Sequence, residues 1–139
     1  MRLMVFKDRN QVIALTAPVA GTQPLSVTPY QALFDTGASA TCISPKIVSE
    51  LGLNPVGKVN MISASHVVPT NQYIFSIGFP TGMQQDATGT ISGNVTMFEN
   101  ITGLEFQPSG AAYDILIGMD IIRRGCLTVA FNGQWTFSF

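Results

Sequence analysis

The sequence predicts a mostly β domain, and three observations support this fold class. Thr, Val, Ile and Phe residues occur in short runs separated by turn residues, and the chain has 13 glycines and 8 prolines. Asn132-Gly133, the strongest short signal for a hairpin, lies between two such runs near the C-terminus. The length of 139 residues suits one domain that buries about two-thirds of the surface exposed by its unfolded chain.

The N-terminal elements follow from polar interruptions of apolar runs. Leu3–Phe6 and Val12–Leu15 flank a polar stretch, which indicates an N-terminal hairpin. Ala17–Pro29 carries three prolines and shows no periodicity, so we expect a loop there. This loop leads into an apolar strand over Tyr30–Phe34, and that strand ends on Asp35.

Two short helices are predicted from their capping residues. Ser44 is a preferred N-cap, Pro45 suits the first helical position, and Gly52 suits the position just past the end. Further along, Asp120 is expected to cap a helical turn over Ile121–Arg124, which a glycine then closes. Both helices are too short to form the framework of the domain.

The middle of the chain is interpreted as strands. Residues 59–79 indicate two strands around the polar centre Ser63–His66, which is the pattern of a projecting hairpin, and Pro69 is unsuited to a central strand. Thr88–Phe98 and Leu104–Phe106 are two further candidates, and glycines obscure their limits. The sequence therefore predicts several strands here without fixing their register.

Apolar patterning defines the C-terminal strands. Ile115–Ile117 is a continuous apolar run, typical of a strand buried on both faces. Leu127–Phe131 and Gln134–Phe139 are expected to pair as a hairpin around Asn132-Gly133. Aromatic residues recur at alternate positions of this hairpin, which favours a core or dimer interface over a ligand-stacking surface: Phe131, Trp135, Phe137 and Phe139.

Composition excludes several classes of function. Only 11% of the residues are charged, and seven Lys and Arg against eight Asp and Glu leave a net charge of −1. This balance argues against binding to nucleic acid or to an anionic membrane. No apolar run approaches the ~20 residues of a membrane span, and no signal-peptide core is present, so we expect a cytoplasmic protein. Such low charge also suggests that a homodimer covers apolar surface.

The cysteines point to neither a disulfide framework nor a metal site. Cys42 and Cys126 are the only two, and no zinc-ligand spacing accompanies them. Cys42 is either a reactive thiol or a buried wall residue, and its neighbours favour the second interpretation. We therefore expect two free thiols, with no metal and no cofactor.

The segment Ala32–Ser39 is the most informative stretch for chemistry. An apolar strand delivers Asp35 into a turn where Thr36 can donate a hydrogen bond and Gly37 lets backbone amides approach the carboxylate. One carboxylate alone hydrolyses little. Two carboxylates a few ångströms apart share a proton, so that a bridging water meets a base and an acid together.

The run Asp35-Thr36-Gly37-Ala38-Ser39 resembles the active-site motif of aspartic proteases. A second signature is similar too: Ile115–Gly118 resembles the element that crosses behind the catalytic loop, and Gly118–Ile122 resembles the short helix that follows it in retroviral-type members. The chain therefore resembles the retropepsin-like aspartic proteases over about Pro29–Phe131. Its pattern is most similar to cellular DNA-damage-inducible-type and bacterial retropepsins.

This resemblance implies a fold and an activity. Because the chain carries one such unit, the expected structure is a single-lobe closed β-barrel, with one or two short helices, in a C2 homodimer. Asp35, Thr36 and Gly37 would be the catalytic residues, and Asp35 and its symmetry mate would form the dyad of an aspartic endopeptidase acting on peptides or proteins. Residues 59–79 would be a flap over the substrate, and the hairpin at 127–139 would form the dimer.

The resemblance also suggests substrate-binding positions, and the sequence departs from viral enzymes near them. The candidates share a place on the catalytic loop, the flap tip or adjoining strands: Leu33, Ala38, Ser39, Cys42, Ser63, Ala64, Ser65 and Leu116. Viral proteases usually have an acidic residue where Ser39 stands and an arginine where Met119 stands. The ion pair that braces the viral loop is therefore absent here.

Plainer interpretations remain open beside these. Asp35 alone could be a turn-former, and Asp120 fits a helix cap better than a second catalytic acid. His66 is the only histidine, and it lies in the expected flap rather than beside a nucleophile. The alternative function is a catalytically silent retropepsin-fold module that binds peptides or dimerises. A third is an assembly domain processed from a longer polyprotein.

Overall fold

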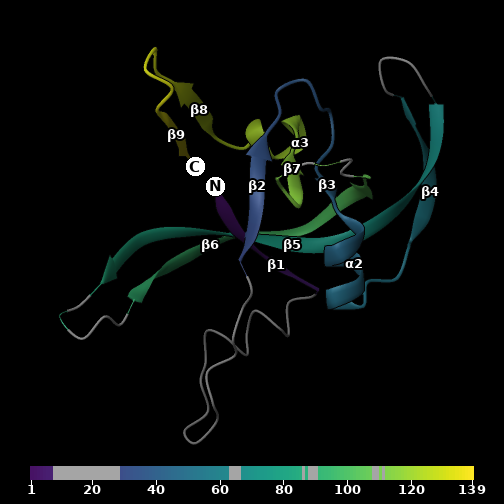
Figure 1. The fold of residues 1–139 in the computed structure, drawn as a ribbon, viewed down its shortest axis with the longest axis horizontal. Coiled ribbons are helices and arrows are strands. Elements are labelled where there is room, and N and C mark those ends of the chain that lie inside the picture. The colour runs from purple at the N-terminus through teal and green to yellow at the C-terminus, as the bar shows by residue number, and fades with distance from the viewer. Residues whose placement is uncertain (8–28, 63–66, 86, 88–90, 108–109, 111) are drawn as a thin grey trace, which may run out of the picture.

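The computed structural model describes residues 1–7, 29–62, 67–85, 87, 91–107, 110 and 112–139. Within these residues the protein is mostly β, as predicted (Figure 1). Seven strands form one sheet: β1 (Arg2–Phe6), β2 (Tyr30–Phe34), β3 (Cys42–Ile43), β4 (Gly57–Ile62), β5 (Val67–Gln85), β6 (Ile91–Glu105) and β7 (Ile115–Ile117). Two more strands, β8 (Cys126–Val129) and β9 (Trp135–Ser138), form a separate hairpin.

Strand order in the large sheet is β1-β2-β7-β3-β6-β5-β4, and β5 pairs with β1 as well. The hydrogen-bonded pairings therefore run from β1 through β2, β7, β3 and β6 to β5, and β5 pairs again with β1. Two pairings are parallel, β2 with β7 and β3 with β6, while the others are antiparallel. Because β7 lies between β2 and β3, the residues that follow β2 and those that precede β3 meet at the ends of these strands.

The core lies against this sheet and is built from aliphatic and aromatic side chains. Its largest fully buried members are Leu3, Phe6, Ile43, Ile47, Phe75, Ile77, Ile115, Ile117 and Ile121. They come from β1, β3, β5, β7 and both helices, so the core ties the two halves of the chain together. Burial of this apolar surface is the main stabilising contribution to such a domain.

The first predicted helix is confirmed. The helix α2 spans Pro45–Leu51, with Ser44 at the N-cap and Gly52 in the left-handed conformation (φ 56°) at its end. The Ser44 hydroxyl, however, makes no capping bond and has no hydrogen-bond partner among the described residues, although it is buried. Ser44 was therefore correctly predicted as the N-cap from its residue type, although its side chain does not make the capping hydrogen bond that explains why serine is preferred there.

The second helix is confirmed, but its N-cap was assigned to the wrong residue. The helix α3 spans Met119–Ile122 and begins two residues earlier than expected, so Gly118 is the N-cap and Asp120 lies in the first turn. The Asp120 carboxylate instead accepts a hydrogen bond from the distant side chain of Thr41, a tertiary contact that the local sequence does not indicate.

Two strands expected at 88–98 and 104–106 are one strand, β6, and residues 88–90 lie outside the described part. The apparent break is a β-bulge, at which Ser76 of β5 faces both Glu99 and Asn100 of β6. Asn100 has a positive φ of 54°, and its N–H donates to the Ser76 hydroxyl at 3.4 Å. The bulge shifts the alternation of side chains, which explains why the sequence pattern is interrupted there.

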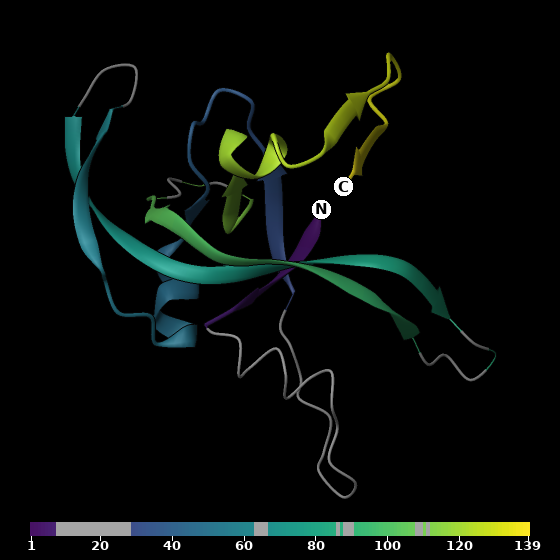
Figure 2. The same cartoon turned by 180° about the vertical axis from the view of Figure 1, so that it is seen from behind.

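The expected hairpin at 59–79 is present as β4 and the first part of β5, which run away from the body of the protein (Figures 1 and 2). Pro69 lies in β5 opposite Asn60. It is tolerated there because β6 pairs with β5 only from Gln72 onward, which leaves one edge open. The expected tip at 63–66, the strand at 12–15 and the loop at 17–28 lie outside the described residues.

The C-terminal hairpin is confirmed, and its turn is one residue longer than the Asn-Gly signal suggested. The Gly133 N–H donates to the Ala130 carbonyl at 3.0 Å, and the Ala130 N–H donates to the Gln134 carbonyl at 2.7 Å. Among the described residues Asn100 is the one non-glycine with positive φ, so within this turn only Gly133 takes the left-handed conformation, with φ 82°. The loop is thus Phe131–Gly133, a turn followed by a glycine bulge.

Aromatic side chains attach this hairpin to the large sheet. Phe137 packs against Phe34 and Phe79, with ring centroids 5.2 and 5.6 Å apart, and Trp135 meets Phe34 at 5.3 Å. Phe139 continues the cluster against Phe79 at 5.4 Å. Phe137 of β9 therefore packs against the core, whereas Trp135 and Phe139 stay 46% exposed and Phe131 is fully exposed, so the core interpretation holds for Phe137. Among the described residues, no helix is long and apolar enough to cross a membrane.

Candidate active site

Asp35 follows β2 directly and begins a tight turn. Its backbone N–H donates to the Ile117 carbonyl at 2.9 Å, which extends the β2–β7 pairing up to the turn. The Gly37 N–H donates to Asp35 Oδ1 at 2.8 Å, and the Ala38 N–H donates to the Asp35 carbonyl at 3.2 Å. The carboxylate is therefore oriented by the backbone of its own turn, as the residue types predicted.

The backbone at Gly37 closely approaches the Asp35 carboxylate. A Cβ on Gly37 would lie 3.2 Å from Asp35 Oδ1, so a larger residue would shift this oxygen by a few tenths of an ångström. Thr36 and Gly37 are both exposed, and Asp35 is partly exposed. The carboxylate thus remains accessible to a ligand or to a second carboxylate.

Gly118 lies behind this turn, where the chain crosses between β7 and α3. A Cβ at Gly118 would lie 2.5 Å from the Ala40 carbonyl carbon and 2.9 Å from the Thr41 nitrogen, which is too close for any side chain. The neighbouring Met119 N–H donates to the Ala38 carbonyl at 2.8 Å. The apolar-apolar-Gly signature therefore reflects two backbone segments packed directly against each other.

Thr41 connects these two segments through its side chain, and the sequence analysis missed it. Its hydroxyl accepts a hydrogen bond from the Gly118 N–H at 3.2 Å and donates to Asp120 Oδ1 at 2.8 Å. Thr41 is fully buried, so both bonds are shielded from water. Nothing in the sequence marks this contact, because Thr41 and Asp120 lie 79 residues apart.

Asp120 is occupied by structural bonds rather than directed at a ligand. Its Oδ1 also accepts the Ile121 N–H at 3.0 Å, in addition to the Thr41 hydroxyl. This geometry agrees with the prediction that Asp120 is structural, although it acts as a tertiary brace instead of an N-cap. Asp35 is therefore the one carboxylate in the turn itself.

Cys42 is the first residue of β3, directly after Thr41, and its side chain is buried. It is only 7% exposed, and burial, together with the negative charges of Asp120 and Asp35, raises the pKa of its thiol to about 11. Its Sγ donates to the Ala40 carbonyl at 3.5 Å. In the described chain Cys42 thus behaves as a wall residue, and its assignment to a substrate subsite stays a prediction.

The other predicted subsite residues differ in exposure. Leu33 is 47% exposed and lines an apolar groove of about 330 Å³ beside Thr36, whereas Leu116 is half-buried and pairs with Cys42. Ala38 and Ser39 line a shallow hollow on the outside of the turn. Ser63, Ala64 and Ser65 lie outside the described residues, so the flap tip is not placed against Asp35.

Arg123 is a second residue that sequence reasoning missed. It borders the hollow that is lined by residues 36–39 and by Met119, and its Nε donates to the Met119 carbonyl at 3.0 Å. Arg123 follows Met119 by one helical turn, and Met119 takes the position where viral enzymes carry an arginine. A guanidinium thus lies beside the turn, displaced by four residues along the chain.

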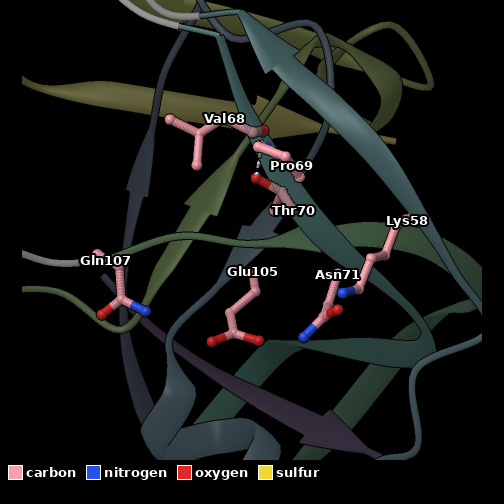
Figure 3. A pocket seen from close by; sticks show the side chains of 7 residues that line it. All are labelled: Lys58, Val68, Pro69, Thr70, Asn71, Glu105 and Gln107. Carbon is pink, nitrogen blue, oxygen red and sulfur yellow. Dashed lines mark hydrogen bonds between the residues drawn. The ribbon is translucent and has the colours of Figure 1, made fainter.

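A separate polar pocket of about 210 Å³ lies where β4 and β5 diverge from β6, and Figure 3 shows its side chains. Lys58, Asn71 and Glu105 direct their polar ends toward the same space, and Glu105 accepts a hydrogen bond from the Tyr73 hydroxyl at 2.8 Å. None of the lining residues belongs to the turn at 35–39. Throughout the described residues, no three His, Cys, Asp or Glu side chains are grouped to hold a metal ion.

Comparison with known proteins agrees with this geometry. The sequence model of a family described as aspartyl protease matches residues 17–121, a range that contains both the Asp35 turn and the crossing at Gly118. The chain belongs to the aspartyl protease family. The aspartic protease resemblance drawn from these two motifs is thereby confirmed.

One solved structure similar to this aspartyl protease is the retroviral protease-like domain of Ddi1 from Leishmania major. The two chains are 14% identical, the match covers 79% of each, and the TM-score is 0.40. No curated protein matches the chain.

The Thr41 brace predicts a ranking of two substitutions. Thr41→Val keeps the side-chain shape but removes the hydroxyl, which leaves the Gly118 N–H without a partner. We expect the free energy of unfolding, measured by urea denaturation, to fall by about 2 kcal/mol. Thr41→Ser keeps the hydroxyl and loses one methyl group, so a fall of about 1 kcal/mol is expected. Equal losses in the two variants would contradict the brace.

The raised pKa of Cys42 predicts selective alkylation. At pH 8, a thiol with a pKa of about 11 is ionised in about one molecule in a thousand, and only the thiolate reacts. We expect iodoacetamide to modify the exposed Cys126 at least about 100-fold faster than Cys42, as read by peptide mass spectrometry. Raising the pH toward 11 deprotonates Cys42 and should accelerate its modification. Similar rates for both cysteines at pH 8 would refute this assignment.

Proposed function

We propose that this aspartyl protease is a homodimeric aspartic endopeptidase, in which Asp35 and its symmetry mate hold the attacking water. The observation that carries the proposal is the oriented carboxylate of Asp35, which is partly exposed at the end of β2 and fixed through Gly37. One chain supplies one such turn. A second copy is therefore needed to bring two carboxylates together.

The proposed chemistry is general acid and base catalysis by the pair. Two carboxylates that share one proton present a base to the water and an acid to the scissile carbonyl. As the water oxygen attacks the carbonyl carbon, one aspartate takes a proton from the water and the other protonates the carbonyl oxygen, which gives a neutral diol. The diol then collapses, the C–N bond breaks, and a proton passes to the leaving amine.

The architecture supports a fixed orientation of each Asp35 carboxylate. The backbone crossing at Gly118 and the Thr41–Asp120 bond hold the turn from behind, so the carboxylate is positioned before any substrate binds. Thr36 and Gly37 complete the catalytic motif at the exposed side of the turn. We propose that this preorganisation replaces the ion pair of viral enzymes, which Ser39 and Met119 cannot form.

We also propose the finer features implied by the resemblance. The return of the strand order from β5 to β1 supports a closed, single-lobe barrel. The hairpin of β4 and β5 would act as the flap over an extended peptide, with Ser63–Ser65 at its tip. Leu33, Leu116, Ala38 and Ser39 would contact the substrate, with Cys42 behind them, and the exposed Leu33 favours an apolar side chain next to the cut.

The test is cleavage of a diverse peptide library from acidic to neutral pH, read by mass spectrometry. We expect the wild-type protein to cleave, a pepstatin-type inhibitor to block it, and Asp35→Asn to lose activity by at least about a thousandfold. Asp114→Asn is the matched control, since the Asp114 carboxylate pairs with Lys46 at 3.4 Å and lies outside the turn that carries Asp35. Its activity should stay near the wild-type level.

Two results would contradict the proposal. Cleavage by Asp35→Asn at the wild-type rate would show that Asp35 is not catalytic. Absence of cleavage by the wild type, while light scattering shows a folded dimer, would favour the non-catalytic peptide-binding module instead.

A further inference from the structure

The tip of the C-terminal hairpin exposes an aromatic side chain completely. Phe131 lies in the turn between β8 and β9 and is fully exposed, at 105%. Figures 1 and 2 show that this hairpin stands away from the large sheet, with its turn at the far end. One exposed apolar residue is ordinary on a protein surface, so what matters is whether Phe131 adjoins further apolar surface.

The base of the same hairpin contains an apolar groove. It is open to the surface, has a volume of about 330 Å³, and is lined mainly by Leu33, Phe34, Thr36, Leu127, Val129 and Trp135. None of these side chains carries a charge; Met1 also lines the groove, and its terminal ammonium donates to the Ala32 carbonyl at 3.3 Å. An apolar cavity of roughly 150 Å³ already accommodates a benzene molecule, so this groove is large enough for one phenyl ring.

Phe131 follows the groove residues of β8 closely in the chain. Leu127 and Val129 line the groove at alternate positions of β8, and Phe131 lies two residues beyond Val129, in the turn. Phe131 cannot fold back into a groove that its own strand forms, because it lies beyond the end of that strand. A second chain can supply the ring.

A second copy of this chain is the occupant that the geometry favours. The groove includes Thr36, the residue after Asp35, and a dyad requires this face to lie against the second copy. In a twofold dimer each contact occurs twice, so a projecting ring and a groove on the same chain are self-complementary. Leu33 and Val129 are 47% and 68% exposed, which leaves apolar surface for this contact to bury.

We propose that Phe131 of each protomer inserts into the apolar groove at the base of the other protomer's C-terminal hairpin. This inference rests on the proposed homodimer and names the contact that holds it. The two C-terminal hairpins would thereby pack against each other's protomer across the twofold axis and fix the distance between the two Asp35 turns.

The first test compares Phe131→Ala with a matched control by analytical ultracentrifugation. Because burying one phenylalanine is worth roughly a factor of ten or more and the dimer buries two, we expect the dimer Kd to rise at least about 100-fold. Val56→Ala removes another exposed apolar side chain, outside the hairpin, and should leave the Kd unchanged. Phe131 is fully exposed in the single chain, so its removal should not unfold the protein.

Trp135 provides a second readout inside the groove. It is the only tryptophan of the chain and is 46% exposed, so covering by a partner's ring should shift its emission to shorter wavelength as the protein concentration rises. This shift should be absent in Phe131→Ala. The proposal is overturned if Phe131→Ala changes neither the dimer Kd nor the Trp135 emission. It is also overturned if the Trp135 emission shifts only when substrate peptide is added and not with protein concentration.

A mixing experiment tests the exchange itself. Val129→Glu places a charge in the groove and should weaken the dimer as Phe131→Ala does. When the two variants are mixed, the Val129→Glu chain offers an intact Phe131 and the Phe131→Ala chain offers an intact groove, so one contact forms. We expect mixed dimers to be more stable than either variant's own dimer, and no gain on mixing would contradict the exchange.

Repeating the ultracentrifugation in an Asp35→Asn background separates this contact from the proposed activity. Dimerisation that depends on Phe131 in a protein without cleavage supports the contact even if the protease assignment fails. Cleavage that depends on Asp35 while dimerisation ignores Phe131 supports the protease and refutes the contact.

Discussion

The direct packing of Gly118 against the backbone of Ala40 and Thr41 is the constraint on which the rest of the structure depends. No side chain fits at this crossing, so β7 passes immediately behind the turn that carries Asp35. The bonds from Met119 to Ala38 and from Gly118 to Thr41 then fix the two segments in register. A carboxylate held in this way is oriented by the fold itself, which is the requirement for a preorganised catalytic group.

Local signals explain what could be predicted from the sequence. The helix over Pro45–Leu51 was predicted because proline and glycine mark its ends, and β7 was predicted because a short apolar run suits a buried strand. The Asp35 turn was recognised because its residue types carry their own geometry. For the same reason, the family could be anticipated from two short motifs.

The errors share a different cause, since each involves contacts between distant segments. The Thr41–Asp120 bond spans 79 residues, and it engages the carboxylate that was expected to be the cap of α3. The bulge at Asn100 depends on Ser76 of the neighbouring strand, so one long strand appeared as two. Arg123 was not predicted as a site residue because it reaches the Asp35 turn through the geometry of α3 and is not part of the Asp-Thr-Gly motif.

The central claim is that Asp35 acts together with its counterpart in a second chain, and a mixing titration tests it most directly. Wild-type protein and Asp35→Asn are combined in varying proportions at a fixed total concentration, and peptide cleavage is measured after subunit exchange. If both carboxylates are required, activity falls with the square of the wild-type fraction, so that about a quarter remains in an equal mixture. A linear fall, with about half remaining, would show that each chain acts alone and would contradict the account.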